Sequence, residues 1–427
     1  MKITIGDTTY TSIKQLSFAP QTDVVGSQIP INTFSADIMT TNSITAGGLA
    51  QLVDDNNRLW AKYWLTKVER KDQETVSIEA VSFIELLERT ELSAQYYNAE
   101  TFSNVISDIF ASVSARISGN IYQVDSSIAS RTVTGFAKEQ TARERLLWVC
   151  FVIGAYVRTA FTDVVDILPI DDSYEIIPIS KTFWKPTIAY NDYVTAVKAI
   201  AYSYTQGTPQ TTDTWVTDGI NYYIQTQQEF SLINPEAPNG ARENIVKIEG
   251  LTLINNNNVS DLLTRISTYY FKRIQLEGEV INNGEYEPGA KVIMNADENT
   301  LIAGYIGEAS FTFGTQAKSK IKLVQTDNVE GGNLTIIGFC DDREIYRQSY
   351  VLPVGYAYSI GNPFVDVMIS GTRFIFYPLD EYAEGTVAAG GTTDNENYEV
   401  ALRLESGKLY VYSVDELTQN DEQVRIS

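Results

Sequence analysis

The chain contains 427 residues with a formal net charge of −22, and none of them is histidine. The acidic balance argues against binding to nucleic acid through its phosphates, which requires clustered lysine and arginine to release counterions. The absence of histidine excludes Ser-His-Asp and Cys-His nucleophilic sites, zinc sites with histidine ligands, and acid–base catalysis by imidazole.

The composition favours β-structure divided among several domains. A single core rarely grows beyond about 250–300 residues, so we expect three or four domains. The 26 tyrosines and 17 phenylalanines far outnumber the 4 methionines, and both aromatic types are enriched in strands. Cys150 lies in an apolar run and is expected to be a buried, inert thiol; Cys340 forms no C-x-x-C pair with it. The N-terminus, MKITIGDTTY, is not typical of a signal peptide, so we expect synthesis in the cytoplasm without export by that route.

Residues 1–92 are expected to form a β-barrel-like domain that ends in a short helix. Phe34, Ala36 and Ile38 alternate with polar neighbours, as in a strand with one buried face. Two Asx-rich tetrads, at residues 54–57 and 71–74, then separate three strand patterns and favour hairpin turns. Asp54 and Asp55 are therefore interpreted as turn residues rather than as metal ligands.

Residues 93–180 are expected to form an α+β domain in which two helices pack on a small sheet. Apolar residues recur at helical spacing from 102 to 113, and a strand is predicted at residues 131–136. Thr141 and Glu144 then form a T-x-x-E capping box, and Gly154 is suited to end the helix that begins there. The twelve residues after Arg145 carry no charge, which is too short a run to span a bilayer and predicts a helix buried on most sides.

Residues 181–328 are expected to form a second β-barrel-like domain with one helix. The strand patterns of this segment cover residues 195–205, 222–233, 275–281, 290–295 and 304–313. The helix is predicted from Val259, with Asn258 or Ser260 as its cap. Tyr269 and Tyr270 at its end are interpreted as packing residues rather than as a stacking platform.

Residues 329–427 are expected to form an acidic C-terminal β-domain, sandwich-like or barrel-like. Five strand patterns, LTIIGF, EIYRQSYV, RFIFYPL, YEVALRLE and LYVYSV, are separated by turns rich in Gly and Asn. Eleven carboxylates and three basic residues follow residue 379, so −8 of the net charge lies in this tail. The segment AEGTVAAGGTTDNENYE is predicted to be a flexible loop, and its last eight residues lack the pattern of a calcium loop.

The sequence contains no motif of a known catalytic or cofactor site. Neither G-x-x-x-x-G-K-[ST] nor G-x-G-x-x-G occurs, so phosphate-binding loops have no support. The sequence leaves open a pair of catalytic carboxylates for glycoside hydrolysis. Such a pair needs no histidine, and the distance between two carboxylates in the fold cannot be read from a sequence. We therefore predict no catalytic, cofactor-binding or metal-binding residues, and no enzyme activity.

Three stretches of the chain carry a resemblance to a family. They are VSIEAVSFIELLERTEL, TARERLLWVCFVIGAYVRTAFTDVVDILPI, and EFSLINPEAP followed by the helix pattern VSDLLTRISTYYFKR. Their order within residues 1–325 resembles the hub proteins of tailed phages and phage-like contractile particles, also called tail-associated or baseplate hub proteins. Family members often carry a cell-wall hydrolase or fibre extension, and this chain shows neither pattern.

The resemblance implies a virion structural protein. It implies a homotrimer whose barrel domains form a ring at the tail tip, joining the tail tube or distal tail protein to a spike or fibre protein and contacting the tape-measure protein. It implies neither sequence-specific binding of nucleic acid nor an integral membrane segment. An acidic inner wall would let DNA pass without adhering, and acidic turn residues such as Asp54 and Asp55 are expected to face the lumen or the solvent.

Two other functions remain alternatives. The first is a tail or cell-surface module whose C-terminal domain binds a glycan. Its candidate contacts would be the aromatic residues Tyr377, Tyr382, Tyr398, Tyr410 and Tyr412. The second is a carboxylate-based cell-wall glycosidase.

Overall fold

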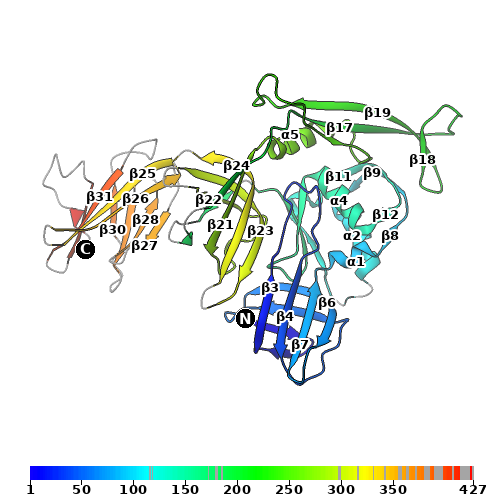
Figure 1. Cartoon of the computed structure of the whole chain (residues 1–427). Helices are drawn as coiled ribbons and strands as arrows, with labels where there is room; N and C mark the ends of the chain where they lie inside the picture. The colour runs from blue at the N-terminus through cyan, green and yellow to red at the C-terminus, as the bar shows by residue number, and fades with distance from the viewer. Residues whose placement is uncertain are drawn as a thin grey trace.

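The protein is mainly β with a few helices, as the sequence predicts. The computed structural model describes residues 1–329 with gaps at 115–116, 118, 172, 178–180, 184–185, 297–299 and 315–316. From residue 331 on, it describes the backbone of the strands alone. In Figure 1 the N-terminal strands (blue) lie at the bottom, most of the helices (cyan) lie above and to the right of them, and the strands from residue 331 on lie at the left end.

A 13-stranded sheet forms the framework of the protein. Its N-terminal strands are β1 (Lys2–Ile5), β2 (Thr8–Tyr10), β3 (Ile13–Phe18), β4 (Thr33–Met39), β5 (Leu49–Val53), β6 (Leu59–Arg70) and β7 (Thr75–Val81). The predicted alternation in β4 is confirmed, since Phe34, Ala36 and Ile38 are buried. Both predicted hairpin turns are confirmed as well, because β5 pairs with β6 and β6 pairs with β7.

The other strands of this sheet come from later in the chain. They are β15 (Tyr174–Ile176), β16 (Thr187–Tyr190), β21 (Ile274–Ile281), β22 (Lys291–Asn295), β23 (Leu301–Thr312) and β24 (Lys318–Val329). The two sets meet at a seam where β23 pairs with β3, with Phe311 opposite Phe18. Trp60 packs edge-to-face on Phe311 with ring centroids 4.8 Å apart, within the range of favourable aromatic pairs. An aromatic cluster thus lies beneath the seam.

A unit of helices and short strands is inserted between the two halves of the sheet. Its elements are α1 (Ile84–Glu88), β8 (Glu91–Leu92), β9 (Gln95–Thr101), α2 (Phe102–Ser114), β10 (Tyr122–Val124), α3 (Ser126–Ala129), β11 (Thr132–Ala137), β12 (Gln140–Thr141), α4 (Ala142–Ile153), β13 (Ala155–Arg158) and β14 (Val165–Pro169). Strands β10, β14 and β13 form one small sheet, and β11 pairs with β9. The helices share one core with these strands.

Helix α4 begins and ends where the sequence predicts. The Thr141 hydroxyl accepts a hydrogen bond from the Glu144 amide at 3.2 Å, and Gly154 ends the helix with φ of +79°. The structure adds one feature that the sequence did not reveal, which is the burial of Arg145 at 1% exposure. Its guanidinium donates to the Tyr97 hydroxyl at 3.0 Å and to the carbonyls of Ser93 and Lys138. A buried cation is tolerated here because several acceptors surround it.

A second insertion follows β16. It contains β17 (Ala196–Gln206), β18 (Trp215–Thr217), β19 (Tyr222–Ile233), β20 (Ile245–Ile248) and α5 (Val259–Tyr270). Helix α5 packs with β17 on the same core as α2 and α4, and Tyr269 and Tyr270 pack against that core as expected. The expected capping role of Asn258 is wrong in part. Asn258 holds the N-cap position, but its side chain bonds Asn255 and Leu253 in the preceding turn and no amide of the helix.

The strands after residue 331 form two further sheets. Their bounds are β25 (Gly331–Cys340), β26 (Arg343–Pro353), β27 (Tyr358–Gly361), β28 (Val365–Ser370), β29 (Arg373–Pro378), β30 (Gly385–Ala388), β31 (Tyr398–Glu405), β32 (Lys408–Ser413) and β33 (Val424–Arg425). All five predicted strands are confirmed, and β27, β28, β30 and β33 were not predicted. The flexible loop predicted for residues 383–399 is wrong in part, because β30 and the first two residues of β31 lie within it. The rest of that segment lies outside the described residues, and so does Tyr382. The other four candidate tyrosines lie in strands.

Candidate functional site

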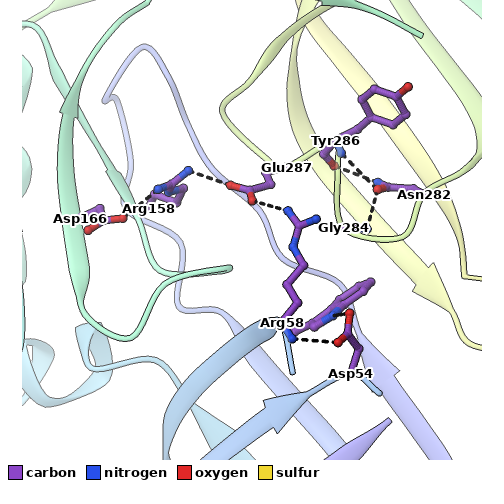
Figure 2. Close-up of polar contacts among 9 residues, drawn as sticks. Asp54, Arg58, Arg158, Asp166, Asn282, Gly284, Tyr286 and Glu287 are labelled. Carbon is purple, nitrogen blue, oxygen red and sulfur yellow. Dashed lines mark hydrogen bonds and ion pairs between the residues drawn. The ribbon is translucent and has the colours of Figure 1, made fainter. Parts of the chain in front are cut away.

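The candidate site is a network of ion pairs that joins three parts of the chain far apart in the sequence. It consists of Arg58, Arg158, Asp166 and Glu287, which we call the junction (Figure 2). Arg58 follows the β5–β6 turn, Arg158 and Asp166 lie on β13 and β14, and Glu287 lies between β21 and β22. The junction therefore connects both halves of the large sheet with the first insertion.

The turn at residues 54–57 positions Arg58. Asp54 Oδ1 accepts hydrogen bonds from the backbone amides of Asn56 and Arg58, both at 2.8 Å, and Asn57 adopts a left-handed φ of +64°. Asp54 is thus a turn residue, as predicted, and is half-buried. The side chain of Asp55 is 79% exposed, in agreement with the expectation that it faces the solvent.

A second Asx-type turn positions Glu287. Asn282 is fully buried, and its Oδ1 accepts from the backbone amides of Gly284 at 3.0 Å and Tyr286 at 3.1 Å. Its amide group donates to the Tyr286 carbonyl at 2.8 Å. Gly284 has φ of +88°, and a Cβ there would lie 3.1 Å from the Arg58 guanidinium. The left-handed φ favours glycine at this position, and the close guanidinium group leaves little room for a larger residue.

The junction balances two cations against two carboxylates. Arg58 Nη2 lies 2.9 Å from Glu287 Oε1, and Arg158 Nη1 lies 2.7 Å from Glu287 Oε2. The other Nη of Arg158 lies 2.9 Å from Asp166 Oδ2. The side chains of Glu287 and Asp166 are only 20% and 11% exposed. Charge-assisted hydrogen bonds of this kind are about twice as strong as neutral ones.

At the junction, burial and ion pairing shift the pKa values of the side chains in opposite directions. Burial raises the pKa of Glu287, while the charges of Arg158 and Arg58 act in the opposite direction. Burial alone would lower the pKa of Arg158, but the hydrogen bond to Asp166 and the two carboxylate charges outweigh it, so its pKa lies above the ordinary value. Arg158 therefore stays charged. The ion pairs of the junction neutralise its charges and connect three distant parts of the chain.

Hydrogen bonds from two arginines also connect the segment between β3 and β4 to helices α4 and α5. Arg143 donates through Nε and Nη2 to the Ile29 carbonyl at 3.1 and 2.6 Å. Arg265 of α5 donates to the carbonyls of Val25 and Phe151, and burial lowers its pKa to about 10. Sequence reasoning missed these contacts. No sequence signal marks them, because the acceptors are backbone carbonyls that the fold brings close.

The described residues give no support for a metal centre, and the described cysteine side chain is not a reactive thiol. Among these residues, no group of three or more Cys, Asp or Glu residues is placed to hold a metal ion. Cys150 is buried, and burial raises the pKa of its thiol, so it is inert as expected. No helix in the described part of the chain has both the length and the apolar composition that a membrane crossing requires.

Comparisons with known proteins identify the fold. No protein-family model matches the chain, and a search of curated proteins finds no match. The structure is similar to the tail protein from Neisseria meningitidis MC58, with a TM-score of 0.54 and 10% identity over 76% of this chain and 95% of that one. It is also similar to the 43 kDa tail protein of prophage MuSo2 from Shewanella oneidensis, with a TM-score of 0.50 and 11% identity over 76% and 97% of the two chains. The chain thus shares the fold of these tail proteins.

Proposed function

We propose that this chain is a structural component of a phage tail or of a phage-like tail particle. The observation that carries the proposal is the fold shared with two tail proteins from different organisms, which covers 76% of this chain and at least 95% of each of theirs. A match over nearly the whole of those chains includes the arrangement of their parts. It is therefore stronger support than a match to one common β-domain.

In the finer form of the proposal, the chain is a hub protein that forms a homotrimeric ring at the tail tip. Its partners are the tail tube or distal tail protein, the tape-measure protein, and a spike or fibre protein. The end strands of the large sheet, β2 and β16, support this form. Each has an outer edge that no described strand covers, and such edges are natural sites of contact between subunits. A net charge of −22 suits a ring through which DNA passes without adhering.

The proposed role is mechanical rather than enzymatic and uses no cofactor. The junction supports it, because each of its carboxylates is bound by a guanidinium group and the network connects segments more than 200 residues apart. We also propose a division into residues 1–92, 93–180, 181–328 and 329–427. The junction then fixes the first three parts relative to one another.

The proposal is tested by locating the protein and by measuring its mass. Antibodies against the purified chain should label one end of tail particles in immunogold images. Light scattering of the purified chain should give a mass near three chains, and negative-stain images should show rings. Labelling along the whole tail, or absence from purified particles, would overturn the tip assignment. A mass of one chain in solution together with one copy per assembled tail would overturn the trimer.

A further inference from the structure

A cavity of about 530 Å³ lies at the end of α4, beside the first turns of α5. The end of β14 and the residues at the start of β11 complete its wall. The apolar part of the wall consists of Val152, Ile153, Pro169, Ile170 and Leu262. The volume is that of a small-ligand pocket, and the cavity shares no lining residue with the junction.

Two guanidinium groups from different elements line this cavity. Arg131 lies immediately before β11, and Arg265 lies in the second turn of α5. Arg131 Nη1 donates to the Ile153 carbonyl at 2.8 Å, and Arg265 donates to the carbonyls of Val25 and Phe151. Neither guanidinium forms an ion pair with a carboxylate of the described residues. Since a guanidinium carries five N–H donors, each has donors left for a ligand.

The positive charge at this cavity is poorly compensated. Burial disfavours the charged form of Arg265, and the nearby charge of Arg131 acts in the same direction. Asp23 opposes both effects from a distance, but its carboxylate accepts hydrogen bonds from the Val25 amide and the Ser27 hydroxyl instead. The pKa of Arg265 still falls to about 10. Two cations that repel each other at one cavity favour an anion placed between them.

The charge of the wall indicates how much negative charge the ligand carries. Among the lining residues, Asp261 has the only carboxylate. It is exposed in the first turn of α5, where an acidic side chain interacts favourably with the helix dipole. Two guanidinium groups and one carboxylate leave a charge of +1 on the wall. A ligand with one negative charge balances it, whereas a phosphate dianion brings one negative charge too many.

A carboxylate fits the geometry of the donors and of the wall. The flat fork of a guanidinium group matches the two oxygens of a carboxylate. The apolar side chains on the same wall can hold a short hydrocarbon stem. They also exclude water from the ion pair, which strengthens the attraction between its charges.

We infer that this cavity binds a single carboxylate carried on a short apolar stem, with Arg131 and Arg265 as its charged contacts. A glutamate side chain of a partner protein has this chemistry, and so has a small free carboxylic acid. The inference assigns a ligand to the chain and depends on neither the tail location nor the trimer. A failure of one therefore leaves the other untouched.

The test titrates the full chain with N-acetylglutamate amide, in which only the side chain is charged. The side-chain NMR signal of Arg265 reports binding, and the variant Arg265→Lys identifies that signal. The probe should shift the signal in a saturable manner. N-acetylglutamine amide is the matched neutral probe and should not shift it. Tighter binding of N-acetylglutamate amide than of butyrate assigns the carboxylate to a protein, and the reverse assigns it to a free acid.

Two variants of exposed residues should change the affinity in opposite directions. Arg131→Gln should weaken binding of N-acetylglutamate amide about tenfold, because one charged hydrogen bond is lost. Asp261→Asn should strengthen it about threefold, because a repelling surface charge is removed. Arg89→Gln is the control for a lost positive charge, since Arg89 pairs with Glu85 at α1 and does not line the cavity.

Several results would overturn the inference. They are the absence of a saturable shift, equal shifts with the glutamate and glutamine probes, and an affinity that neither Arg131→Gln nor Asp261→Asn changes. Tighter binding of inorganic phosphate than of N-acetylglutamate amide would overturn the assignment of a single negative charge. Thermal melting checks that each variant is folded, and the gain expected for Asp261→Asn cannot arise from misfolding.

Discussion

Glu287 illustrates how a turn residue comes to connect distant segments. In the sequence it belongs to NNGEYEPG, a run that indicates a turn and nothing more. In the structure, Asn282 orders that turn and aims the Glu287 carboxylate between Arg58 and Arg158 (Figure 2). The turn was predictable because its chemistry is local. Its two partners were not, because they lie 229 and 129 residues away.

Replacing Glu287 with glutamine should destabilise the protein. The amide keeps the shape of the side chain, but it leaves Arg58 and Arg158 without their shared countercharge. A hydrogen bond to a charged group contributes about 1.5–3 kcal/mol, so the free energy of unfolding should fall by roughly that amount. Urea unfolding followed by tryptophan fluorescence measures the change.

The matched control is Glu285→Gln in the same turn. Glu285 pairs with Lys181 at 2.5 Å, but its side chain is 42% exposed, and surface ion pairs contribute at most about 1 kcal/mol. If the two variants lose the same stability, the junction is no stronger than an ordinary surface pair.

At the scale of single elements, local chemistry was a reliable guide. The limits of α4 followed from Thr141 and Gly154, and the hairpin turns followed from their Asx residues. Burial of Arg145 and Arg265 was not predictable, because their acceptors are backbone carbonyls that the fold brings together. The same applies to Asn258, whose side chain satisfies the turn before α5 instead of the helix itself.

The change Gly154→Ala should destabilise α4 at its C-terminal end. An alanine at φ of +79° costs about 1–2 kcal/mol, because its Cβ approaches the following carbonyl oxygen. The nearest side-chain atom to that Cβ, Arg265 Nε, would be 3.6 Å away, so crowding adds little. Chemical unfolding measures the loss in the free energy of unfolding.

Gly48→Ala provides the comparison for this change. No atom lies within 4 Å of a Cβ at that position, and its φ is not in the left-handed region. It should leave stability unchanged or raise it slightly. Equal losses at both glycines would show that the left-handed conformation is not the cause.

At the scale of the whole molecule, the mainly β class was predictable from composition and alternation, but the pairing of the strands was not. Nothing in the residues around Phe18 indicates that their neighbour is Phe311. Likewise, the pattern of residues 195–233 predicted strands without showing that they leave the large sheet and pack with α5 on the helical core.

A chain ending at residue 329 should fold on its own. Every strand pair of the large sheet and every described core cluster lies within residues 1–329. The shortened chain should therefore unfold in a cooperative transition with a midpoint close to that of the full chain. Circular dichroism during heating measures both midpoints, and aggregation or a broad transition of the shortened chain would show that the last residues stabilise the sheet.

The seam between β3 and β23 also constrains the order in which the protein can form. A ribosome releases β3 long before β23 exists, so the edge of β3 stays open while almost 300 further residues are made. Pairings this distant in sequence form slowly, because the closure entropy is lost before the contact stabilises the chain. The N-terminal hairpins can fold early, but the seam and the junction can close only near the end of synthesis. Until then, β3 is an unprotected edge, and we expect newly made chains to be most prone to aggregate in that interval.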